Sequence, residues 1–278
     1  MTDSAPAPDA VVLRCFDRTA DYDACVELQR RTWGSDFSDV TPGSILKISQ
    51  KVGGLSAGAF APDGRLLAFL YGLTGLRHGK PIHWSHMMAV APEARDLGLG
   101  TRLKLFQREF LLAQGVEEVE WTFDPLEARN AHLNFNHLGA EVAEYVENMY
   151  EGETGSDLWE GIGTDRLILV WRIASERVSQ ALVDRRHTAS DPFRAAPMVN
   201  EGNGIPDSAP ELPRLRLEVP ESIQDLKSDD PEQAAAWRSS TRWAFETYLA
   251  RGYRVEAFYR DRASRRCFYC LESSGTVA

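Results

Sequence analysis

A strand that runs into a glycine-bearing loop and then into a helix constrains this chain more than any other feature. Residues 83–90 form the predicted strand, residues 91–94 a turn, and residues 95–100 (Arg-Asp-Leu-Gly-Leu-Gly) the loop that opens the helix. The first amide groups of a helix have no intrahelical partner, and the helix dipole places about half a positive charge there. Glycine at positions 98 and 100 removes the Cβ atoms that would keep an anion away from the backbone. The segment therefore predicts a phosphate-binding loop.

Other phosphate loops do not fit this segment. A dinucleotide-binding fingerprint needs a third glycine three residues after Gly100, where Leu103 stands. A P-loop needs Gly-Lys-Ser/Thr, which the segment lacks. Arg-x-x-Gly-x-Gly after a strand ending in Met-Ala-Val-x-Pro instead resembles the pyrophosphate loop of the GNAT acyltransferase superfamily, whose members bind acyl-coenzyme A. An ordinary turn at the start of a helix is the alternative interpretation.

The resemblance implies that acyl-coenzyme A lies along the end of the strand and on the loop. The residues that it places there are Met88, Ala89, Val90, Arg95, Asp96, Leu97, Gly98, Leu99, Gly100, Thr101 and Arg102, together with Asn130 from a later segment. A backbone amide of residues 88–90 would hold the thioester oxygen. Because the net charge of −10 repels an anionic cofactor, local cations are needed, and the sequence offers Arg95, Arg102 and Lys104 beside the loop.

The order of the predicted elements is strand, helix, helix, three strands, loop-helix, strand, helix and two strands over residues 11–173. This is the order of a GNAT domain. The resemblance implies an α/β (α+β) fold, with a central mixed, mostly antiparallel sheet flanked by helices and one central strand splayed to admit the pantetheine arm. We expect a disordered tail (1–10), the GNAT domain (11–187), a linker (188–212) and a small strand-helix-strand-strand unit (213–278).

Local signals support these elements. Apolar residues at three- and four-residue spacing predict a helix over residues 100–114, with Gly115 as its stop. Pro62-Asp63-Gly64 predicts a hairpin turn between two strands. Thr41 before a proline, and likewise Asp230 before a proline, predict helix caps.

A longer sequence pattern indicates a particular group within the GNAT superfamily. It consists of Trp121-Thr-Phe-Asp-Pro-Leu-Glu-Ala-Arg-Asn-Ala-His-Leu-Asn-Phe135, then Leu-Gly-Ala at 138–140, Gly-Thr-Asp-Arg-Leu at 163–167, and Trp171. The pattern resembles a group of predicted GNAT acyltransferases, some of which are associated with N-acylamino acid metabolism, including N-succinylation of amino acids. The resemblance implies an acetyl or succinyl donor and a small-molecule amine acceptor, with an amino acid as the leading candidate.

Acyl transfer from a thioester to an amine has three requirements. The amine must be deprotonated, the carbonyl oxygen must be stabilised as it gains charge, and the leaving thiolate must be held or protonated. The resemblance implies direct transfer in a ternary complex, in which proximity replaces an enzyme nucleophile. His86 is the first candidate for the general base, because an imidazole pKa of about 6.5 suits proton abstraction near neutral pH. A hydrogen-bonded structural histidine is the alternative.

Further catalytic candidates follow the strand that ends at Asp124. By the resemblance, His132 and Asn134 lie near the sulfur, and Asp124 is a second base candidate or positions His132. Asp124 is also a common type of turn residue and cap. Many superfamily members have a tyrosine acid where this chain has Phe135. The proton donor is therefore open: a neighbouring polar side chain, water or none.

The composition argues against several other kinds of function and location. The net charge of −10 argues against a nucleic-acid partner, no apolar run is long enough to span a bilayer, and the start of the chain does not resemble a signal peptide. Cys267 and Cys270 lie three apart in a strand-like run, so their side chains face opposite ways and predict structural thiols rather than a metal or redox site. We expect a cytoplasmic protein without a metal.

Two other functions compete with an acyltransferase. The first is an acyl-coenzyme A-binding regulatory or scaffold module that has lost turnover. Phe135 supports this alternative because it replaces the usual tyrosine and cannot donate a proton. An oxidoreductase on a Rossmann fold is opposed by Leu103 and by the antiparallel hairpin before the loop. The sequence also leaves open whether the C-terminal unit packs on the first domain or on the second subunit of a homodimer.

Overall fold

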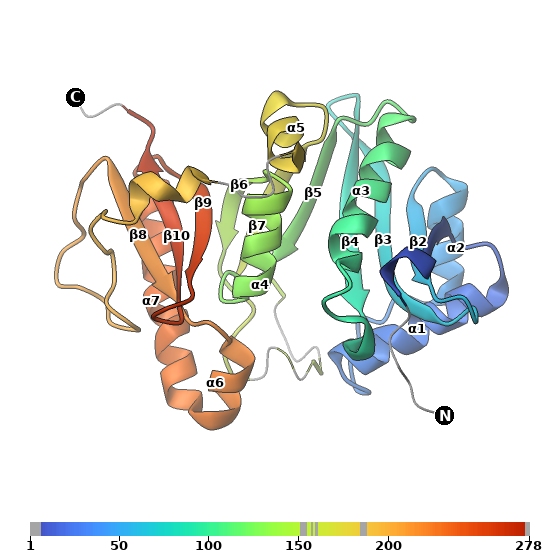
Figure 1. Ribbon diagram of the computed structural model, residues 1–278, viewed down its shortest axis with the longest axis horizontal. Coiled ribbons are helices and arrows are strands. Elements are labelled where there is room, and N and C mark those ends of the chain that lie inside the picture. Colours follow the sequence, from blue (N-terminus) through green and yellow to red (C-terminus); the bar gives the residue numbers. More distant parts are fainter. Residues whose placement is uncertain (1–6, 151–154, 157, 159–160, 184–187, 276–278) are drawn as a thin grey trace. The chain divides into compact units, whose positions relative to one another are not determined.

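The computed structural model describes residues 7–150, 155–156, 158, 161–183 and 188–275 (Figure 1). By its internal contacts the chain forms two compact units. The first unit contains residues 1–121, 153–157 and 172–174, and the second contains residues 122–152, 158–171 and 175–278. This division differs from the predicted boundary at residue 188, because the last helices and strands share contacts with residues that follow Trp121.

The first unit is built on a mixed, mostly antiparallel sheet, as predicted. Its strands are β1 (Val12–Cys15), β2 (Leu55–Phe60), β3 (Leu66–Arg77), β4 (Lys80–Val90) and β5 (Glu118–Phe123), the last of which passes into the second unit after Trp121. Strands β1 to β4 pair antiparallel in chain order, and β5 pairs parallel to β4. The hairpin at residues 61–65 joins β2 and β3, where the amide of Gly64 donates to the carbonyl of Ala61.

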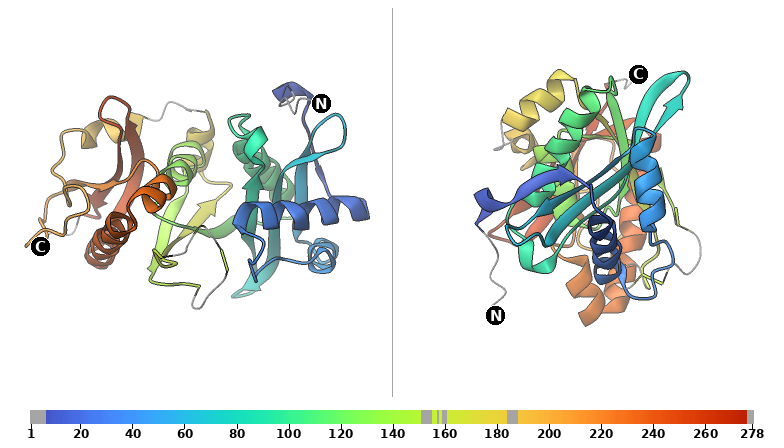
Figure 2. Two further views of the ribbon diagram at one scale, coloured as in Figure 1. Left: turned by 90° about the horizontal axis from the view of Figure 1, so that it is seen from below. Right: turned by 90° about the vertical axis from the view of Figure 1, so that its right-hand side faces the viewer.

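Helices cover both faces of this sheet. They are α1 (Thr19–Trp33), α2 (Gly43–Lys51), the short 3-10 turn η2 (Pro92–Ala94) and α3 (Leu99–Leu112). Helices α1 and α2 lie on one face and α3 on the other (Figure 2). Their inner faces bury Leu28, Leu46 and Leu103 almost completely, and each such side chain contributes about 1.5–3 kcal/mol to stability.

The start of α2 differs from the prediction. Thr41 does not cap this helix; Pro42 is the N-cap residue. The amide of Thr41 donates to the Gln29 side chain at 2.7 Å, and the threonine hydroxyl lies 3.4 Å from the Met87 sulfur. The predicted cap is wrong because Thr41 is buried in the core, where its polar groups bind a neighbouring helix and strand.

The beginning of the chain is partly described. Residues 1–6 of the predicted disordered tail lie outside the described residues. Pro8–Ala10 form a short 3-10 helix, η1. The Arg102 side chain donates to the carbonyls of Pro8 at 2.9 Å and Val11 at 2.8 Å, so α3 anchors the segment that precedes β1.

The second unit contains the rest of the predicted elements. Its first part consists of α4 (Ala128–Ala131), the π-helical turn η3 (His132–His137), β6 (Glu141–Val146), β7 (Arg166–Arg172), α5 (Glu176–Val183) and the 3-10 segment η4 (Thr188–Phe193). Strands β6 and β7 pair antiparallel. A single helix was predicted over residues 128–138; in the structure the helix changes to π winding at His132. Of the predicted glycine-rich loop, 152–164, residues 152–154, 157, 159 and 160 lie outside the described residues.

A three-stranded sheet follows in the second unit. Its elements are β8 (Arg214–Val219), α6 (Ile223–Asp229), α7 (Pro231–Ala250), β9 (Tyr253–Asp261) and β10 (Arg266–Ser273), with the strands in the order β8-β10-β9. The predicted cap of the long helix is confirmed, because the Asp230 side chain accepts a hydrogen bond from the Gln233 amide at 3.0 Å. Helix α6 was not predicted.

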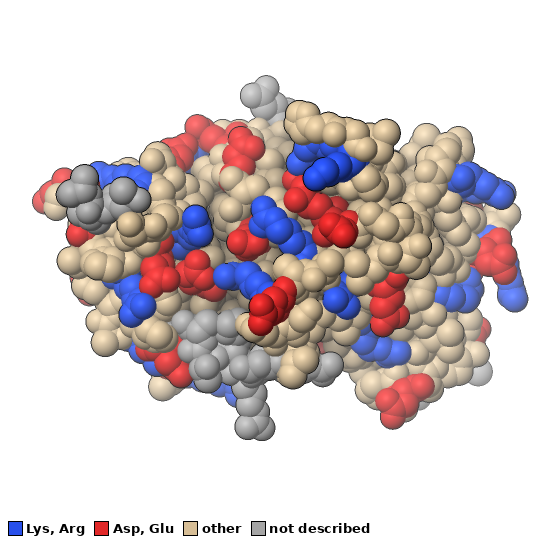
Figure 3. All heavy atoms as spheres, turned by 90° about the horizontal axis from the view of Figure 1, so that it is seen from above, with Lys and Arg blue, Asp and Glu red and all other residues tan. Residues whose placement is uncertain are grey.

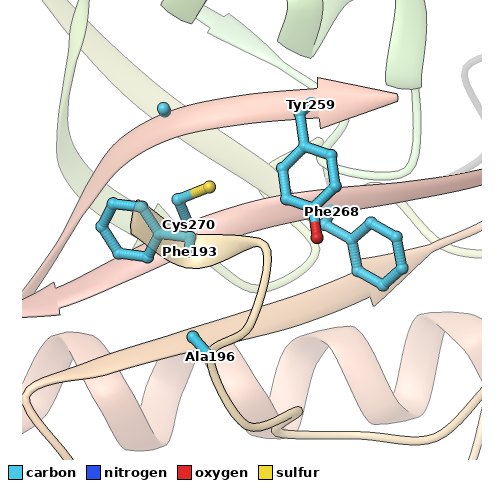
Figure 4. Close-up of a cluster of buried hydrophobic side chains, with 6 residues drawn as sticks. Phe193, Ala196, Tyr259, Phe268 and Cys270 are labelled. Carbon is cyan, nitrogen blue, oxygen red and sulfur yellow. The ribbon is translucent and has the colours of Figure 1, made fainter. Parts of the chain in front are cut away.

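Part of the predicted linker is packed structure. A buried cluster joins this segment to β9 and β10 and consists of Phe193, Ala196, Ala257, Tyr259, Phe268 and Cys270 (Figure 4). The amide of Val199 donates to the carbonyl of Arg216 at 2.8 Å, so the segment also runs beside β8. Its few apolar residues follow no helical or strand period, which is why composition alone suggested a linker.

Both cysteines of the Cys-x-x-Cys motif are buried on β10 as free thiols. Burial raises the pKa of the Cys267 and Cys270 thiols. A raised pKa disfavours the thiolate that metal binding and redox chemistry need. Within the described ranges, none of the helices combines the length and apolar character that a bilayer-crossing segment requires.

Candidate active site

The glycine loop opens α3 with an uncapped N-terminus. Gly98 is the N-cap residue and has a left-handed backbone (φ 68°), as does Asp96 (φ 71°). No side chain of the described residues caps this helix, and its first helical bond runs from the Arg102 amide to the Gly98 carbonyl at 3.1 Å. The amides of Leu99, Gly100 and Thr101 therefore precede the helical hydrogen-bond ladder, as expected for an anion site.

Space in front of the loop is open. A Cβ atom added at Gly98 would meet no other atom within 4 Å. Glycine is needed there because of its positive φ, a conformation that costs other residues about 1 kcal/mol or more. Arg95 and Asp96 on the same loop are exposed.

The cations expected beside the loop lie in three different settings. Arg95 is exposed on the loop, whereas the Arg102 guanidinium is bound to the carbonyls of Pro8 and Val11. Lys104 is only 2% exposed and does not face the loop. The prediction for Lys104 is wrong because its position on α3 faces the sheet.

A β-bulge interrupts β4 at His86. In the pairing with β3, Met87 lies opposite Tyr71 and Ser85 lies opposite Gly72, so His86 is the extra residue. Bulges re-aim side chains and are common next to active sites. Here the Ser85 hydroxyl binds a side chain of α3, while the Met87 sulfur contacts Thr41 on the opposite face of the sheet.

The bulge presents the imidazole of His86 at the surface. Its ring packs edge-on against Tyr71, with ring centroids 5.8 Å apart. Although the residue is exposed, the surrounding protein lowers the pKa of this imidazole from its usual 6.5, and Asp39 opposes the shift. His86 is therefore predominantly neutral at pH 7, the form that a general base requires.

Strands β4 and β5 pair over a short distance. Within the described residues, their parallel ladder joins His83 to Val119 and Trp84 to Glu120. The Arg77 side chain binds both carboxylate oxygens of Glu120, at 2.5 and 2.6 Å. We call the end of this ladder, where Ser85 and Trp121 follow the last pair, the fork.

A buried polar cluster that the sequence did not reveal lies at the fork. Lys104 Nζ donates to Ser85 Oγ at 2.9 Å and to Gln107 Oε1 at 3.2 Å, and it lies 3.9 Å from the centre of the Trp121 ring. His83 is fully buried beside Gly72, and a Cβ atom on Gly72 would lie only 2.1 Å from the imidazole Nε2. The glycine therefore makes room for the histidine ring.

Asp124, in the second unit, is held in a buried ion-pair network. Its carboxylate accepts from the Leu126 amide at 2.8 Å and from Arg238 at 2.5 Å, and Arg166 lies 3.7 Å away. Both carboxylate oxygens are therefore engaged by neighbouring groups. These contacts favour the turn-and-cap role that the sequence left open for Asp124.

His132 is fixed by its neighbours on the π-helical turn. Its Nδ1 lies 2.9 Å from the Asn136 amide nitrogen, and its Nε2 lies 3.2 Å from the His137 Nε2. Burial, and then the nearby His137, Arg260 and Arg262, lower the pKa of His132 to about 4. The imidazole is therefore neutral at pH 7, with both ring nitrogens engaged.

The remaining candidates of the second unit differ in exposure. Asn134 is buried, and Asn130 is exposed on α4. Phe135 is 1% exposed and packs edge-on against Phe123 and Tyr269.

The candidate residues thus form two groups. The loop, residues 88–90 and His86 belong to the first unit, while Asp124, Asn130, His132 and Asn134 belong to the second. Within the first group, β4 and α3 carry the base candidate and the uncapped helix terminus.

Charge is mixed on the face shown in Figure 3, where acidic and basic side chains alternate. Ion pairs of the described residues include Arg31–Glu93 and Arg177–Glu256. On this face, the described residues form no extended basic stripe of the kind that nucleic-acid binding uses.

The strand order, the bulged central strand and the glycine loop at the start of α3 define the α/β fold class that the resemblance implied. No protein-family model matches the chain, and no curated protein matches its sequence. Solved structures similar in fold include an aminoglycoside 6'-acetyltransferase type Ii, with 16% identity over 59% of this chain and 99% of that chain (TM-score 0.47).

Two further similar structures contain acetyl-coenzyme A. One is YncA, a putative acetyltransferase from Salmonella typhimurium, with 15% identity over 60% of this chain and 96% of that chain (TM-score 0.48). The other is a GNAT superfamily phosphinothricin acetyltransferase from Sinorhizobium meliloti, with 16% identity over 58% of this chain and 87% of that chain (TM-score 0.46). At these identities the similarity concerns the fold alone.

Proposed function

We propose that this protein is an acyl-coenzyme A-dependent N-acyltransferase. It transfers an acetyl or succinyl group from the thioester to the amine of a small molecule, with an amino acid as the leading acceptor. The observation that carries the proposal is the uncapped N-terminus of α3, opened by a left-handed Gly98 directly after β4. The choice of acyl group and acceptor rests on the sequence resemblance.

The loop supplies the cofactor's diphosphate site. The amides of Leu99, Gly100 and Thr101 are available as donors, and the dipole of α3 favours negative charge at the same place. Arg95 adds an exposed cation. These local groups offset the repulsion from a chain whose net charge is −10. Acyl-coenzyme A, when bound, supplies the activated thioester carbonyl.

His86 takes the proton from the acceptor amine. The bulge exposes the imidazole, and its lowered pKa keeps it neutral at pH 7. A positioned base of this kind contributes roughly 10²–10⁴-fold to a rate. No enzyme nucleophile is required, because holding amine and thioester together lowers the barrier by proximity.

The second candidate function is an acyl-coenzyme A-binding module without turnover. It is favoured by Phe135, which cannot donate a proton and is buried among aromatic rings. The two functions share the loop and differ in whether the thioester is consumed.

A thiol-release assay with acetyl- and succinyl-coenzyme A and a panel of amino acids tests the proposal, with calorimetry of coenzyme A binding beside it. Thiol release that depends on one of the amines, with the matching amide found by mass spectrometry, supports the acyltransferase. Binding without release for every amine supports the module. Absence of binding contradicts both.

The four free cysteines support a cytoplasmic location. Disulfides form in oxidising compartments, whereas reducing compartments keep thiols free. Fractionation of the source cells tests this point.

A further inference from the structure

Lys104 is a buried cation without a counter-ion. Its contacts in the described part of the chain are the Ser85 hydroxyl, the Gln107 amide oxygen and the Trp121 ring, all of them neutral. Removing an ammonium group from water is costly unless a carboxylate compensates it, and an apolar side chain of similar size is often more stable in such a place. A lysine that costs stability here points to a function.

The position of Lys104 joins three elements of the proposed site. It projects from α3, one turn after the loop, and its Nζ reaches the residues that follow the last paired positions of β4 and β5, namely Ser85 and Trp121. Strand β4 extends about 16 Å from Val90 to Ser85, at 3.3 Å per residue. An extended arm of that length that starts at the loop and follows β4 passes residues 88–90 and reaches Ser85, so a role for Ser85 and Lys104 in the transfer requires the thioester to lie deeper in the fork than the resemblance implies.

Of the described groups near the fork, Lys104 is the one suited to donate a proton. His83 is excluded by its hydrogen bond and its protonation state. Thr74 donates to the Gly53 carbonyl at 2.8 Å, so its hydroxyl accepts from His83 Nδ1 at 2.9 Å. Burial, and then the charge of Lys104, lower the pKa of His83 to about 3, which keeps this imidazole neutral.

The other neighbours do not compete for the role. Glu120, on β5, is bound by Arg77. Gln107, on α3 itself, does not titrate, and its amide nitrogen is buried without a partner among the described residues.

We propose that Lys104 and Ser85 form a proton relay that protonates the leaving thiolate, an inference that rests on the proposed acyltransferase function. When the carbon–sulfur bond breaks, its electron pair goes to sulfur. The Ser85 hydroxyl gives its proton to that sulfur and takes one from the Lys104 ammonium, which becomes a neutral amine. The proton that His86 removes from the acceptor amine is released to solvent, and solvent reprotonates Lys104.

The acidity of Lys104 suits this step. Burial lowers the pKa of its ammonium group from 10.5 to about 7. An alkyl thiol has a pKa of about 8.5, so the proton moves toward the stronger base. The relay also supplies the donor that Phe135 cannot provide.

The test uses the full-length enzyme and four variants, with Lys51→Met on the exposed end of α2 as the control. Lys104→Met removes the relay, and Lys104→Arg keeps the charge but not an acidic proton. Ser85→Ala removes the hydroxyl, and Ser85→Thr retains it. The measurements are kcat and KM for the acyl thioester between pH 5.5 and 9, together with thermal unfolding.

We expect Lys104→Met, Lys104→Arg and Ser85→Ala to lower kcat by about 100-fold, the lower part of the range for acid–base catalysis. Their KM for the thioester stays within threefold, and Ser85→Thr restores most of kcat. The wild-type kcat falls as pH rises above about 7, where Lys104 loses its proton. In Lys104→Met, kcat does not show this fall at alkaline pH. Lys104→Met also unfolds at a higher temperature than the wild type.

Several results would overturn the relay. If Lys104→Arg or Ser85→Ala turns over like the wild type, the relay is absent while the acyltransferase function stands. If Lys104→Met keeps the alkaline limb of the pH profile, another group donates the proton. If the wild type binds coenzyme A but releases no thiol with any amine, the proposed function and the relay both fail.

Discussion

The two histidines that the sequence offered for catalysis, His86 and His132, lie in regions of opposite character. His86 projects from a bulge, is exposed, and packs edge-on against the Tyr71 ring. His132 lies on a π-helical turn, where Asn136 and His137 engage both ring nitrogens. Both imidazoles have lowered pKa values, yet of the two only His86 has a ring nitrogen without a hydrogen bond to another described residue. Residue type finds candidates, and their hydrogen bonds decide which can act.

The loop before α3 and the carboxylate of Asp124 differ in the same way, namely in whether their polar groups already have partners. The loop before α3 leaves backbone donors uncapped, whereas Asp124 is surrounded by groups that satisfy it. We therefore expect substitutions in the first group to change activity and substitutions in the second group to change stability.

His86→Ala has the largest expected effect. Loss of the base should lower kcat about 1,000-fold, within the range for general base catalysis. The free energy of unfolding should change little, since the side chain is exposed. Steady-state kinetics and urea unfolding measure the two quantities. A wild-type rate would remove His86 from the mechanism, and a large stability loss would make it a structural histidine.

Asp124→Ala tests the expectation that residues of the second group maintain stability. Removing the carboxylate leaves Arg238 and Arg166 without their shared partner in a buried site, and a broken buried pair costs about 3 kcal/mol or more. Urea unfolding should show this loss. Asp225→Ala, an exposed carboxylate near the start of α6, is the matched control. An unchanged stability together with a lost rate would return Asp124 to the list of bases.

Gly100→Val tests the loop directly. The branched side chain blocks the approach of a diphosphate to the first amides of α3, and we expect coenzyme A affinity to fall about 100-fold, a loss of about 2.7 kcal/mol. Ala113→Val places the same side chain at the exposed other end of this helix and should bind normally. Calorimetry measures both. Equal affinities would mean that the cofactor binds elsewhere.

The smallest expected effect is on the pH dependence of stability. His132 has a folded-state pKa of about 4 and an unfolded value near 6.5. Between these values the unfolded chain binds more protons, so stability is present above pH 6.5 and decreases as pH falls toward 4. His132→Asn should flatten this slope in urea titrations at pH 4–7. A slope identical to that of the wild type would show that His132 does not contribute.

Much of the fold could be predicted because its signals are local. Gly98 and Gly100, followed by apolar residues at helical spacing, located the loop and α3. Pro62-Asp63-Gly64 located a hairpin, and Asp230 located the start of α7.

The parts that could not be predicted depend on tertiary contacts. Buried residues alternate along β4 on both sides of His86, so the pattern hides the bulge there. Lys104 looked like a partner for phosphate because it is charged and near the loop, whereas the face it occupies is set by packing against β4 and β5. Phe193 and Ala196 looked like parts of a linker because the strands that cover them come much later in the chain.

The attachment of Pro8 and Val11 to Arg102 has a practical consequence for purification. An affinity tag fused close ahead of residue 8 would lie a few residues from this anchor and would disturb the first turn of α3, which carries the proposed diphosphate site. Titrations with coenzyme A are therefore best done on protein whose tag has been cleaved, or on protein that carries the tag at the opposite end.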